Sequence, residues 1–398
     1  MEILFVVLAP IDGNTSGIIS NIGIINGLTE LGHNVSICTT MFYGDNVKEI
    51  KNYFKHDVKI YRINRNKLYK TAVNVRKKQN LIKKFYSISR KLYYKFKIID
   101  NFKPVAKSIS LNELEEFLGL KYFDVVISAS DPKSSHLAVK NLIKQGLKYG
   151  KWIEYWGDPL AADITRHNIW PKACLKFVET KLIKDCDKIF YVSPFTKELQ
   201  QSLYKKYASK MEFEPLPYNE AKIYPISDLS DEKVSLGYFG DYSSNVRNIM
   251  PLYNLAKKNK DILLEIAGNS DLKLETYSNI NIYQRLKKEE IEKKEEKVDI
   301  LVCILNTKGT QIPGKLYYSA STNKPILVIL DGDEQEKMEN YLTSFNRFEI
   351  CKNKENDIKK AINKICNENK MYKPSEYFEP SKIAKNILQK TFGDASND

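Results

Sequence analysis

Short apolar runs alternate with longer stretches of helical periodicity through the first half of the chain. The apolar runs predict strands at residues 2–9, 34–40, 57–63, 123–130, 151–156 and 188–193. Between them, apolar residues recur at spacings of three and four, which predicts helices at 18–32, 135–147, 173–185 and 195–207. This alternation is typical of a parallel sheet with helices on its faces.

The same alternation starts again after Pro215 and Pro217. It predicts strands at 234–240, 262–268, 279–284, 299–305, 325–330 and 347–352, and helices at 248–258, 287–297, 315–320 and 356–367. A chain of 398 residues is comfortable for two domains. We therefore expect an α/β fold of two doubly wound Rossmann-like domains, residues 1–218 and 219–375, followed by a C-terminal helix and tail at 376–398. Ligands of such sheets bind at the carboxyl ends of the strands, here in a cleft between facing domains.

The spacing of the cysteines and histidines and the first ten residues limit the class of protein. The six cysteines are scattered without metal-binding spacing, which indicates a reducing compartment. Residues 1–10 lack a basic leader and a cleavage site, and no run of about 18 apolar residues occurs, so we expect a cytoplasmic protein without a membrane span. The four histidines show no ligand spacing, and Asp331 and Asp333 fit a turn after a strand, so no metal is predicted.

The net charge of +14 is concentrated in one segment. Residues 62–107 contain fifteen lysines and arginines against one acid, Asp100, which accounts for the whole excess. Within it, apolar residues recur every three or four positions among lysines and arginines, at Leu81, Phe85, Ile88, Leu92, Phe96 and Ile99. This pattern favours an amphipathic cationic helix on an anionic membrane surface, the alternative being a solvated helix packed on the sheet. No RNA-binding or helix-turn-helix pattern accompanies it, so a nucleic-acid partner is not expected.

Three glycine-bearing segments follow predicted strands of the second domain. Gly240 ends the first, with Arg247 close to the next helix, and Gly268 ends the second. Gly314 and Lys315 open the third helix. Two cations at helix N-termini on one sheet edge predict a diphosphate site, whereas each taken alone fits loop punctuation or a surface ion pair.

The order of these segments resembles the donor domain of GT-B glycosyltransferases. The matching stretches are GYFGDY…RN, AGNSD, DILVCILN and IPGKLYYSASTNKPIL. The first domain agrees, with a loop bearing Gly13 and Gly17, the LGHNV turn, FDVVIS and LIKDCDKIFYVSPFT. The chain looks most like the large retaining group, similar to glycosyltransferase family 4, that builds surface polysaccharides.

The resemblance implies a nucleotide-diphosphate sugar in the second domain and an acceptor in the first. The donor-binding positions that it implies are Gly240, Asp241, Arg247, Gly268, Pro313, Gly314, Lys315 and Tyr318, and the acceptor-side positions are Gly17 and Ser130. Arg247 and Lys315 match the cations that hold the diphosphate where other glycosyltransferases use a metal, so no cofactor is expected.

The chain departs from the retaining pattern at two positions. Members of that group usually carry two glutamates around this turn, and their places hold Thr310 and Tyr318. The contacts that those acids make to the sugar and the ribose must come from elsewhere or be absent. The donor and the retaining outcome are therefore open.

Acids after the fourth and fifth strands are the candidates for catalysis. Asp131 follows the fourth strand and Asp158 follows the fifth. Similar enzymes often carry a histidine after the fourth strand, and the nearest matching position in this chain is Ser130. An inverting reaction needs a base, whereas a front-face retaining reaction can use the leaving phosphate. Each acid also has a purely structural interpretation. Asp131 could be the N-cap of the following helix, and Asp158 could form a turn before Pro159. Glu179 is expected on a helix surface or at a domain seam.

Together these features predict a metal-independent hexosyltransferase at the inner face of the cell membrane. Its acceptor would be a lipid-linked or polyanionic glycan in the assembly of a cell-surface polysaccharide such as a capsule. Two alternatives remain: a non-catalytic GT-B subunit that binds a glycan or a partner enzyme, and a nucleotide-sugar epimerase of the same fold.

Overall fold

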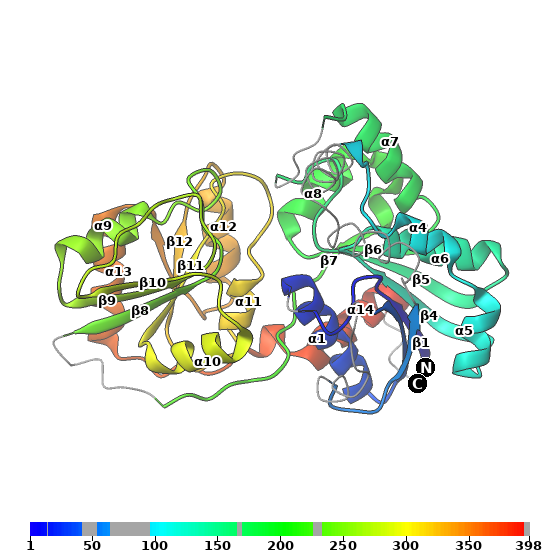
Figure 1. Cartoon of the computed structure of the whole chain (residues 1–398), viewed down its shortest axis with the longest axis horizontal. Coiled ribbons are helices and arrows are strands. Elements are labelled where there is room, and N and C mark those ends of the chain that lie inside the picture. The colour runs from blue at the N-terminus through cyan, green and yellow to red at the C-terminus, as the bar shows by residue number, and fades with distance from the viewer. Residues whose placement is uncertain (14, 42–53, 64–95, 165–168, 226–232, 394–398) are drawn as a thin grey trace, which may run out of the picture. The chain divides into compact units, whose positions relative to one another are not determined.

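The computed structural model of the chain divides into two compact units. It describes residues 1–13, 15–41, 54–63, 96–164, 169–225 and 233–393. The first unit comprises Met1–Pro215 together with the chain from Pro380 onward, and the second comprises Leu216–Glu379. Each unit has its own parallel sheet with helices on both faces (Figure 1).

Seven parallel strands form the sheet of the first unit, in the order β3-β2-β1-β4-β5-β6-β7. Their bounds are β1 Glu2–Val6, β2 Asn34–Thr40, β3 Lys59–Ile63, β4 Tyr122–Ala129, β5 Lys148–Trp156, β6 Lys188–Tyr191 and β7 Met211–Phe213. The strand β1 lies between β2 and β4, with Val6 opposite Cys38 on one side and Ser128 on the other. The order of the strands therefore reverses at β1, which is where doubly wound sheets bind ligands.

Helices cover both faces of this first sheet. They are α1 Ser16–Glu30, α4 Lys103–Ser108, α5 Leu111–Leu118, α6 Ser134–Lys144, α7 Lys172–Ile183, α8 Pro194–Leu203 and α14 Pro380–Phe392, with the 3-10 helix η2 at Lys205–Lys210. Because both faces are covered, the central strands are buried almost throughout, as Ile3, Leu4, Phe5 and Val6 of β1 show.

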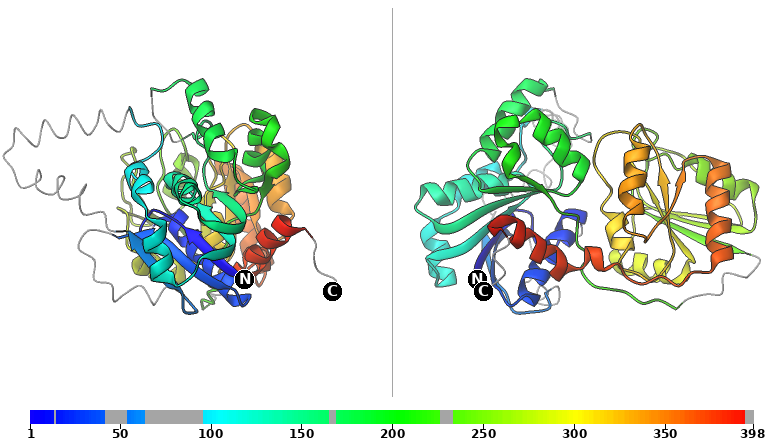
Figure 2. Two further views of the ribbon diagram at one scale, coloured as in Figure 1. Left: turned by 90° about the vertical axis from the view of Figure 1, so that its right-hand side faces the viewer. Right: turned by 180° about the vertical axis from the view of Figure 1, so that it is seen from behind.

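The C-terminal helix α14 belongs to the first unit and packs against α1 (Figure 2). The two helices approach closely at Gly27, where an added Cβ atom would lie 2.0 Å from the carbonyl oxygen of Pro380. Lys390 of α14 pairs with the buried Glu214 at 2.6 Å. The segment that we expected at 376–398 as a separate helix and tail thus completes the first unit from Pro380 onward.

The second unit has a six-stranded parallel sheet in the order β10-β9-β8-β11-β12-β13. Its strands are β8 Val234–Phe239, β9 Ile262–Ala267, β10 Ile280–Tyr283, β11 Ile300–Ile304, β12 Ile326–Leu330 and β13 Glu349–Lys352. Its helices are α9 Met250–Lys258, α10 Lys288–Lys297, α11 Lys315–Ser319, α12 Gln335–Thr343 and α13 Glu355–Glu368, with the 3-10 helix η3 at Glu376–Phe378. The apolar faces of α9 and α13 pack on the sheet in one core cluster.

The prediction of two Rossmann-like α/β domains is confirmed. The structure adds α4, α5, α12 and the short strand β7, which the sequence analysis did not identify. The signal for α5 was present, since Leu111, Leu114 and Leu118 follow helical spacing and Ser110 accepts a hydrogen bond from the N–H of Glu113. Of the predicted basic helix, Leu81, Phe85, Ile88 and Leu92 lie outside the described residues.

Candidate functional site

Asp131 lies just beyond β4 and is held by a buried lysine that the sequence analysis missed. The Lys133 ammonium lies 2.7 Å from a carboxylate oxygen of Asp131. The side chain of Lys133 is 5% exposed, whereas that of Asp131 is 52% exposed. Burial alone would lower the pKa of Lys133, but the negative charges of Asp131, Asp158 and Asp163 outweigh it and raise that pKa. The lysine therefore stays charged beneath a carboxylate that faces solvent.

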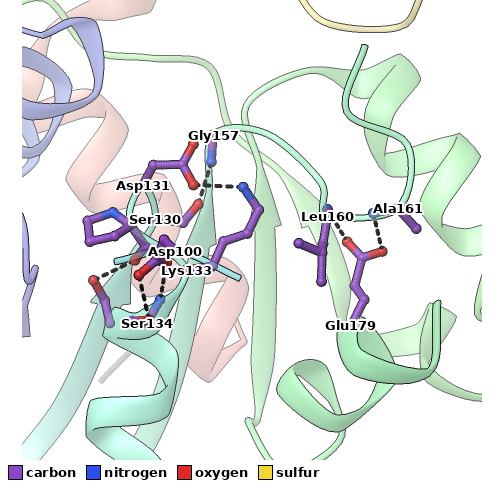
Figure 3. A network of polar contacts seen from close by, with 11 residues as sticks. Asp100, Ser130, Asp131, Lys133, Ser134, Gly157, Leu160, Ala161 and Glu179 are labelled. Atoms are coloured by element: carbon purple, nitrogen blue, oxygen red, sulfur yellow. Dashed lines mark hydrogen bonds and ion pairs between the residues drawn. The ribbon is translucent and has the colours of Figure 1, made fainter. Parts of the chain in front are cut away.

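A different acid caps the helix after Asp131. The carboxylate of Asp100 accepts hydrogen bonds from the backbone N–H of Ser134 at 2.9 Å and from its hydroxyl at 2.6 Å (Figure 3). The N-cap interpretation of Asp131 is therefore wrong for this structure, because the long connection that carries Asp100 supplies the cap. This leaves Asp131 available for another role.

A hydrogen bond from backbone to side chain joins the loops after β4 and β5. The Gly157 N–H donates to the hydroxyl oxygen of Ser130 at 3.2 Å (Figure 3). Ser130 is buried, so its hydroxyl holds the two loops together at the sheet edge. Gly17, the other predicted acceptor-side residue, is partly exposed in the first turn of α1, which begins after β1. The strands β1, β4 and β5 therefore bring Gly17, Asp131 and Asp158 to the same edge of the sheet.

Glu179 is a buried support for the loop that carries Asp158. Its carboxylate accepts from the N–H groups of Leu160 at 2.7 Å and Ala161 at 3.1 Å (Figure 3). It also accepts from the Tyr204 hydroxyl at 2.5 Å. The prediction of a helix surface or a domain seam is wrong, because Glu179 points into the first unit and is fully buried. Burial raises the pKa of this carboxyl despite the three donors.

The histidine that follows β4 belongs to the core and not to the site. The ring of His136 stacks on Trp156 at 4.6 Å, and its Nδ1 lies 2.8 Å from the Ser128 hydroxyl. Complete burial lowers the pKa of His136 well below its usual value, so the ring is neutral. The acids whose charges act on Lys133 at this edge of the sheet are Asp131, Asp158 and Asp163.

In the second unit, the Lys315 side chain crosses directly over Gly240. A Cβ atom added to Gly240 would lie 1.8 Å from the Lys315 Nζ, and one added to Gly268 would lie 2.1 Å from the Gly240 carbonyl oxygen. Glycines at strand ends can leave room for a ligand, but these two do not. They instead allow two loops and one lysine side chain to pack together, and only glycine fits at Gly240.

The Lys315 ammonium is buried and has no hydrogen-bond partner among the described residues. It lies 4.9 Å from the centre of the Tyr238 ring. Burial lowers the pKa of Lys315 to about 8, and the charge of Arg247 adds to this shift. A lysine that binds a phosphate from solvent would be expected to expose its ammonium, but the charged end of Lys315 is buried. Since α11 has only five residues, its dipole adds little at this position.

Arg247 links the loops that follow β8 and β11. Its Nε donates to the side-chain oxygen of Asn306 at 3.0 Å, and Nη1 donates to the backbone carbonyl of Asp241 at 3.1 Å. It is partly exposed and precedes α9 by three residues, in a turn where Ser243 and Arg247 exchange backbone hydrogen bonds. Asp241 is itself fixed, since its carboxylate accepts from the Asn269 N–H at 2.9 Å.

A cavity of about 200 Å³ lies beside Asn306, between the loops after β11 and β12. Its lining comprises residues 305, 306 and 308–311 from the first loop, Asp331, Asp333 and Glu334 from the second, and Met338 of α12. Gly332, with a φ of +84°, forms the turn between the two aspartates. Among the predicted donor residues, Pro313 is buried, while Gly314 and Tyr318 are partly exposed around α11. In the part of the chain that the structure describes, no three His, Cys, Asp or Glu side chains are grouped to hold a metal.

The cap at α6 gives a stability prediction. Asp100→Ala should lower the free energy of unfolding by about 1–2 kcal/mol, because two hydrogen bonds at the helix start are lost. Asp100→Asn should lower the free energy of unfolding by only a few tenths of the loss caused by Asp100→Ala, since asparagine caps a helix almost as well as aspartate. Urea unfolding followed by circular dichroism measures both. Equal stability of Asp100→Ala and the unmodified protein would contradict this assignment.

Comparison with known proteins identifies the fold. No protein-family model and no curated protein matches the sequence. Among solved structures, TarM aligns with a TM-score of 0.55 at 11% identity, covering 100% of this chain and 96% of its own. HepE from Anabaena, solved with UDP and glucose, aligns with a TM-score of 0.54 at 11% identity over 98% of this chain and 95% of its own. A UDP-N-acetylglucosamine 2-epimerase aligns with a TM-score of 0.51 at 10% identity over 98% and 95%. The chain therefore has the two-domain GT-B fold that these proteins share.

Proposed function

We propose that this protein is a glycosyltransferase with a nucleotide-diphosphate sugar as donor. The observation that carries the proposal is the buried Lys315 ammonium, which lacks a hydrogen-bond partner among the described residues and lies close enough to Arg247 for their charges to interact. The charges of Glu295 and Asp241 act on Lys315, but neither forms an ion pair with it among the described residues, and burial still lowers its pKa. A buried cation without a paired counter-ion is unfavourable, and a diphosphate would supply that negative charge. HepE, which was solved with UDP and glucose, supports a donor of this class.

In this proposal the two cations promote departure of the nucleotide diphosphate. Negative charge develops on the leaving phosphate as its bond to the sugar breaks, and Arg247 and Lys315 stabilise that charge. They would take the part that a metal ion plays elsewhere. The Arg247 guanidinium, held in place by its hydrogen bonds to Asn306 and Asp241, would bind phosphate oxygens with its other N–H groups, and Lys315 would add a point charge. In an inverting reaction, Asp131 would accept the proton of the acceptor hydroxyl; in the retaining reaction that the sequence resemblance favours, the leaving phosphate itself would take it.

The cavity beside Asn306, the residue that accepts a hydrogen bond from Arg247, is the place that we propose for the transferred sugar. Its volume of about 200 Å³ is below the roughly 300–1,000 Å³ of pockets that hold whole ligands, so it suits one ring. Thr310, which replaces the first family glutamate, lines it together with Asp331 and Asp333. These carboxylates would accept hydrogen bonds from sugar hydroxyls, as the missing glutamates would have done.

For the acceptor, we propose a lipid-linked or polyanionic glycan of cell-surface polysaccharide assembly, such as a capsule, bound at Asp131 and Asp158. The basic segment 62–107 would hold the enzyme at the inner face of the membrane, without a nucleic-acid partner. None of the helices within the described residues combines the length and the apolar character of a membrane span.

One alternative has a specific observation in its favour. The similarity to a UDP-N-acetylglucosamine 2-epimerase is of nearly the same strength as that to TarM. An epimerase would convert its nucleotide sugar without any acceptor, whereas a non-catalytic subunit would neither convert nor hydrolyse it. Product analysis with and without a glycan acceptor separates the three functions.

The cation pair is tested by nucleotide binding. Arg247→Ala and Lys315→Ala should each weaken binding of a nucleoside diphosphate by about ten- to a hundredfold, because each removes a charge-assisted contact. Isothermal titration with UDP, GDP and ADP measures this change. Lys360→Ala, which removes an exposed lysine of α13 outside the cavity lining, is the matched control and should bind normally. Unchanged affinity in both cation variants would remove the donor site.

The lowered pKa of Lys315 predicts proton uptake on binding. Lys315 has a pKa of about 8 in the free protein, and a bound diphosphate should raise it. Affinity should therefore be constant below pH 7 and fall by about tenfold per pH unit above pH 8, because the neutral lysine must first gain a proton. Titration calorimetry in two buffers of different ionisation enthalpy counts the protons. Lys315→Met should abolish the uptake, and uptake that persists in this variant would assign it to another group.

The role of Asp131 is tested by turnover. Asp131→Asn should lower the transfer rate by about a hundredfold if Asp131 is the base, with little change in nucleotide affinity. Asp163→Asn, which also removes a negative charge near Lys133, is the control and should retain most activity. A normal rate in Asp131→Asn would exclude Asp131 as base and favour the leaving phosphate in that role.

A further inference from the structure

The helix α7 presents an exposed stripe on the side opposite its packed face. Leu175, Glu179, Leu182 and Ile183 are buried in the first unit. Cys174, Phe177, Lys181 and, directly after the helix, Lys184 are exposed at spacings of three and four residues. Phe177 is 60% exposed, more than any other large apolar or aromatic side chain described in this unit. A phenylalanine on a solvated helix face contributes nothing to the core.

Further exposed apolar residues lie at the N-terminal end of α7. Ile169 is 47% exposed and stands three residues before the helix, next to Trp170. The indole N–H of Trp170 donates to the backbone carbonyl of Phe96 at 2.7 Å, and Phe96 is 51% exposed. Scattered exposed apolar residues are ordinary, but a cluster of them indicates an interaction site.

The exposed charges of α7 itself are all positive, and Asp185, which follows the helix, pairs with Lys140 and Lys184. Lys172, Lys176 and Lys181 lie on α7, and the one acid of the helix, Glu179, is buried and faces inward. The Lys181 ammonium lies 4.1 Å from the centre of the Phe177 ring, so cation and apolar surface are adjacent. Phe96 also belongs to the basic segment 62–107, so its hydrogen bond with Trp170 places this residue of the segment close to the start of α7.

We infer that this surface, formed by Phe96, Ile169, Trp170 and the exposed side of α7, docks on an anionic lipid bilayer. Apolar side chains would enter the interface while the surrounding lysines meet the headgroups, which is the pattern of interfacial helices. A phenylalanine can also stack on a base, but the aliphatic Ile169 offers no stacking face and tryptophan is typical of membrane interfaces, which favours lipid over RNA. The inference rests on the proposed membrane association and gives it a surface; it does not depend on glycosyl transfer.

Tryptophan fluorescence provides a direct measurement. Of the three tryptophans, Trp152 and Trp156 are fully buried, so Trp170 is the one that vesicles can reach. Phosphatidylglycerol-containing vesicles should shift its emission to the blue, and vesicles of phosphatidylcholine alone should not. Trp170→Phe should abolish the shift.

Co-sedimentation of the full chain with the same vesicles tests the residues. Phe177→Ser should weaken binding by about tenfold, since an inserted aromatic side chain is lost. Lys172→Gln with Lys181→Gln should weaken it by about twenty-fivefold, at roughly fivefold for each lysine. The matched controls are Phe117→Ser, which changes a side chain of similar exposure on α5, and Lys359→Gln with Lys360→Gln on α13. Both controls should bind as the unmodified protein does.

Three results would overturn the inference. They are no binding of the unmodified protein to anionic vesicles, equal binding by Phe177→Ser and Phe117→Ser, and binding to RNA in preference to lipid. Equal binding of these two serine variants would assign membrane contact to the rest of segment 62–107. Nucleoside diphosphate affinity, measured on the same preparations, tests the proposed function separately, and no α7 variant should change it.

Discussion

Every strand pair in both sheets is parallel, and this constraint determines where chemistry can occur. In a parallel sheet all strands point the same way, so the loops after them meet at one edge. The first sheet thereby collects Gly17, Ser130, Asp131 and Asp158 from three separate parts of the sequence. The second collects Gly240, Arg247 and the Asn306 loop. The common direction of the strands thus decides where each candidate site lies, and the individual side chains decide its chemistry.

Two buried lysines at these edges have opposite electrostatic environments. Lys133 is surrounded by three carboxylates, which raise its pKa and make it a permanent partner for Asp131. Lys315 lies near Arg247 and an aromatic ring, and its pKa falls to about 8. The charge on Lys133 is satisfied within the protein, whereas the charge on Lys315 lacks an equivalent partner within the described residues. This difference supports an acceptor role for the first edge and an anion-binding role for the second.

The fold could be predicted from the sequence because strand runs and helical spacing are local signals that repeat many times. The positions at the sheet edges could also be predicted, since they follow directly from the strand ends. The hydrogen-bond and ion-pair partners that lie far apart in the sequence could not be predicted. Nothing in the order of residues indicates that Asp100 caps α6, that Glu179 turns inward to hold Leu160 and Ala161, or that Lys133 lies beneath Asp131.

The glycines illustrate the same limit. The sequence required small residues at Gly240 and Gly268, and the structure has a close approach at both. What approaches is protein: the Lys315 side chain at one position and the Gly240 backbone at the other. The sequence shows that a glycine ends the strand, but only the folded structure shows whether a ligand or another part of the protein lies against it.

The return of the chain at Pro380 makes the second unit an insertion within the first. Residues 216–379 are synthesised before α14, yet α14 packs on α1, which lies near the start of the sequence. On the ribosome, the second unit can fold as soon as η3 has emerged, whereas the face of α1 around Gly27 stays uncovered until the last helix is released. The first unit, although it begins first, is completed last, and its assembly includes contacts between residues more than 350 positions apart, such as Gly27 with Pro380. Contacts of that separation form slowly because a long loop must close first.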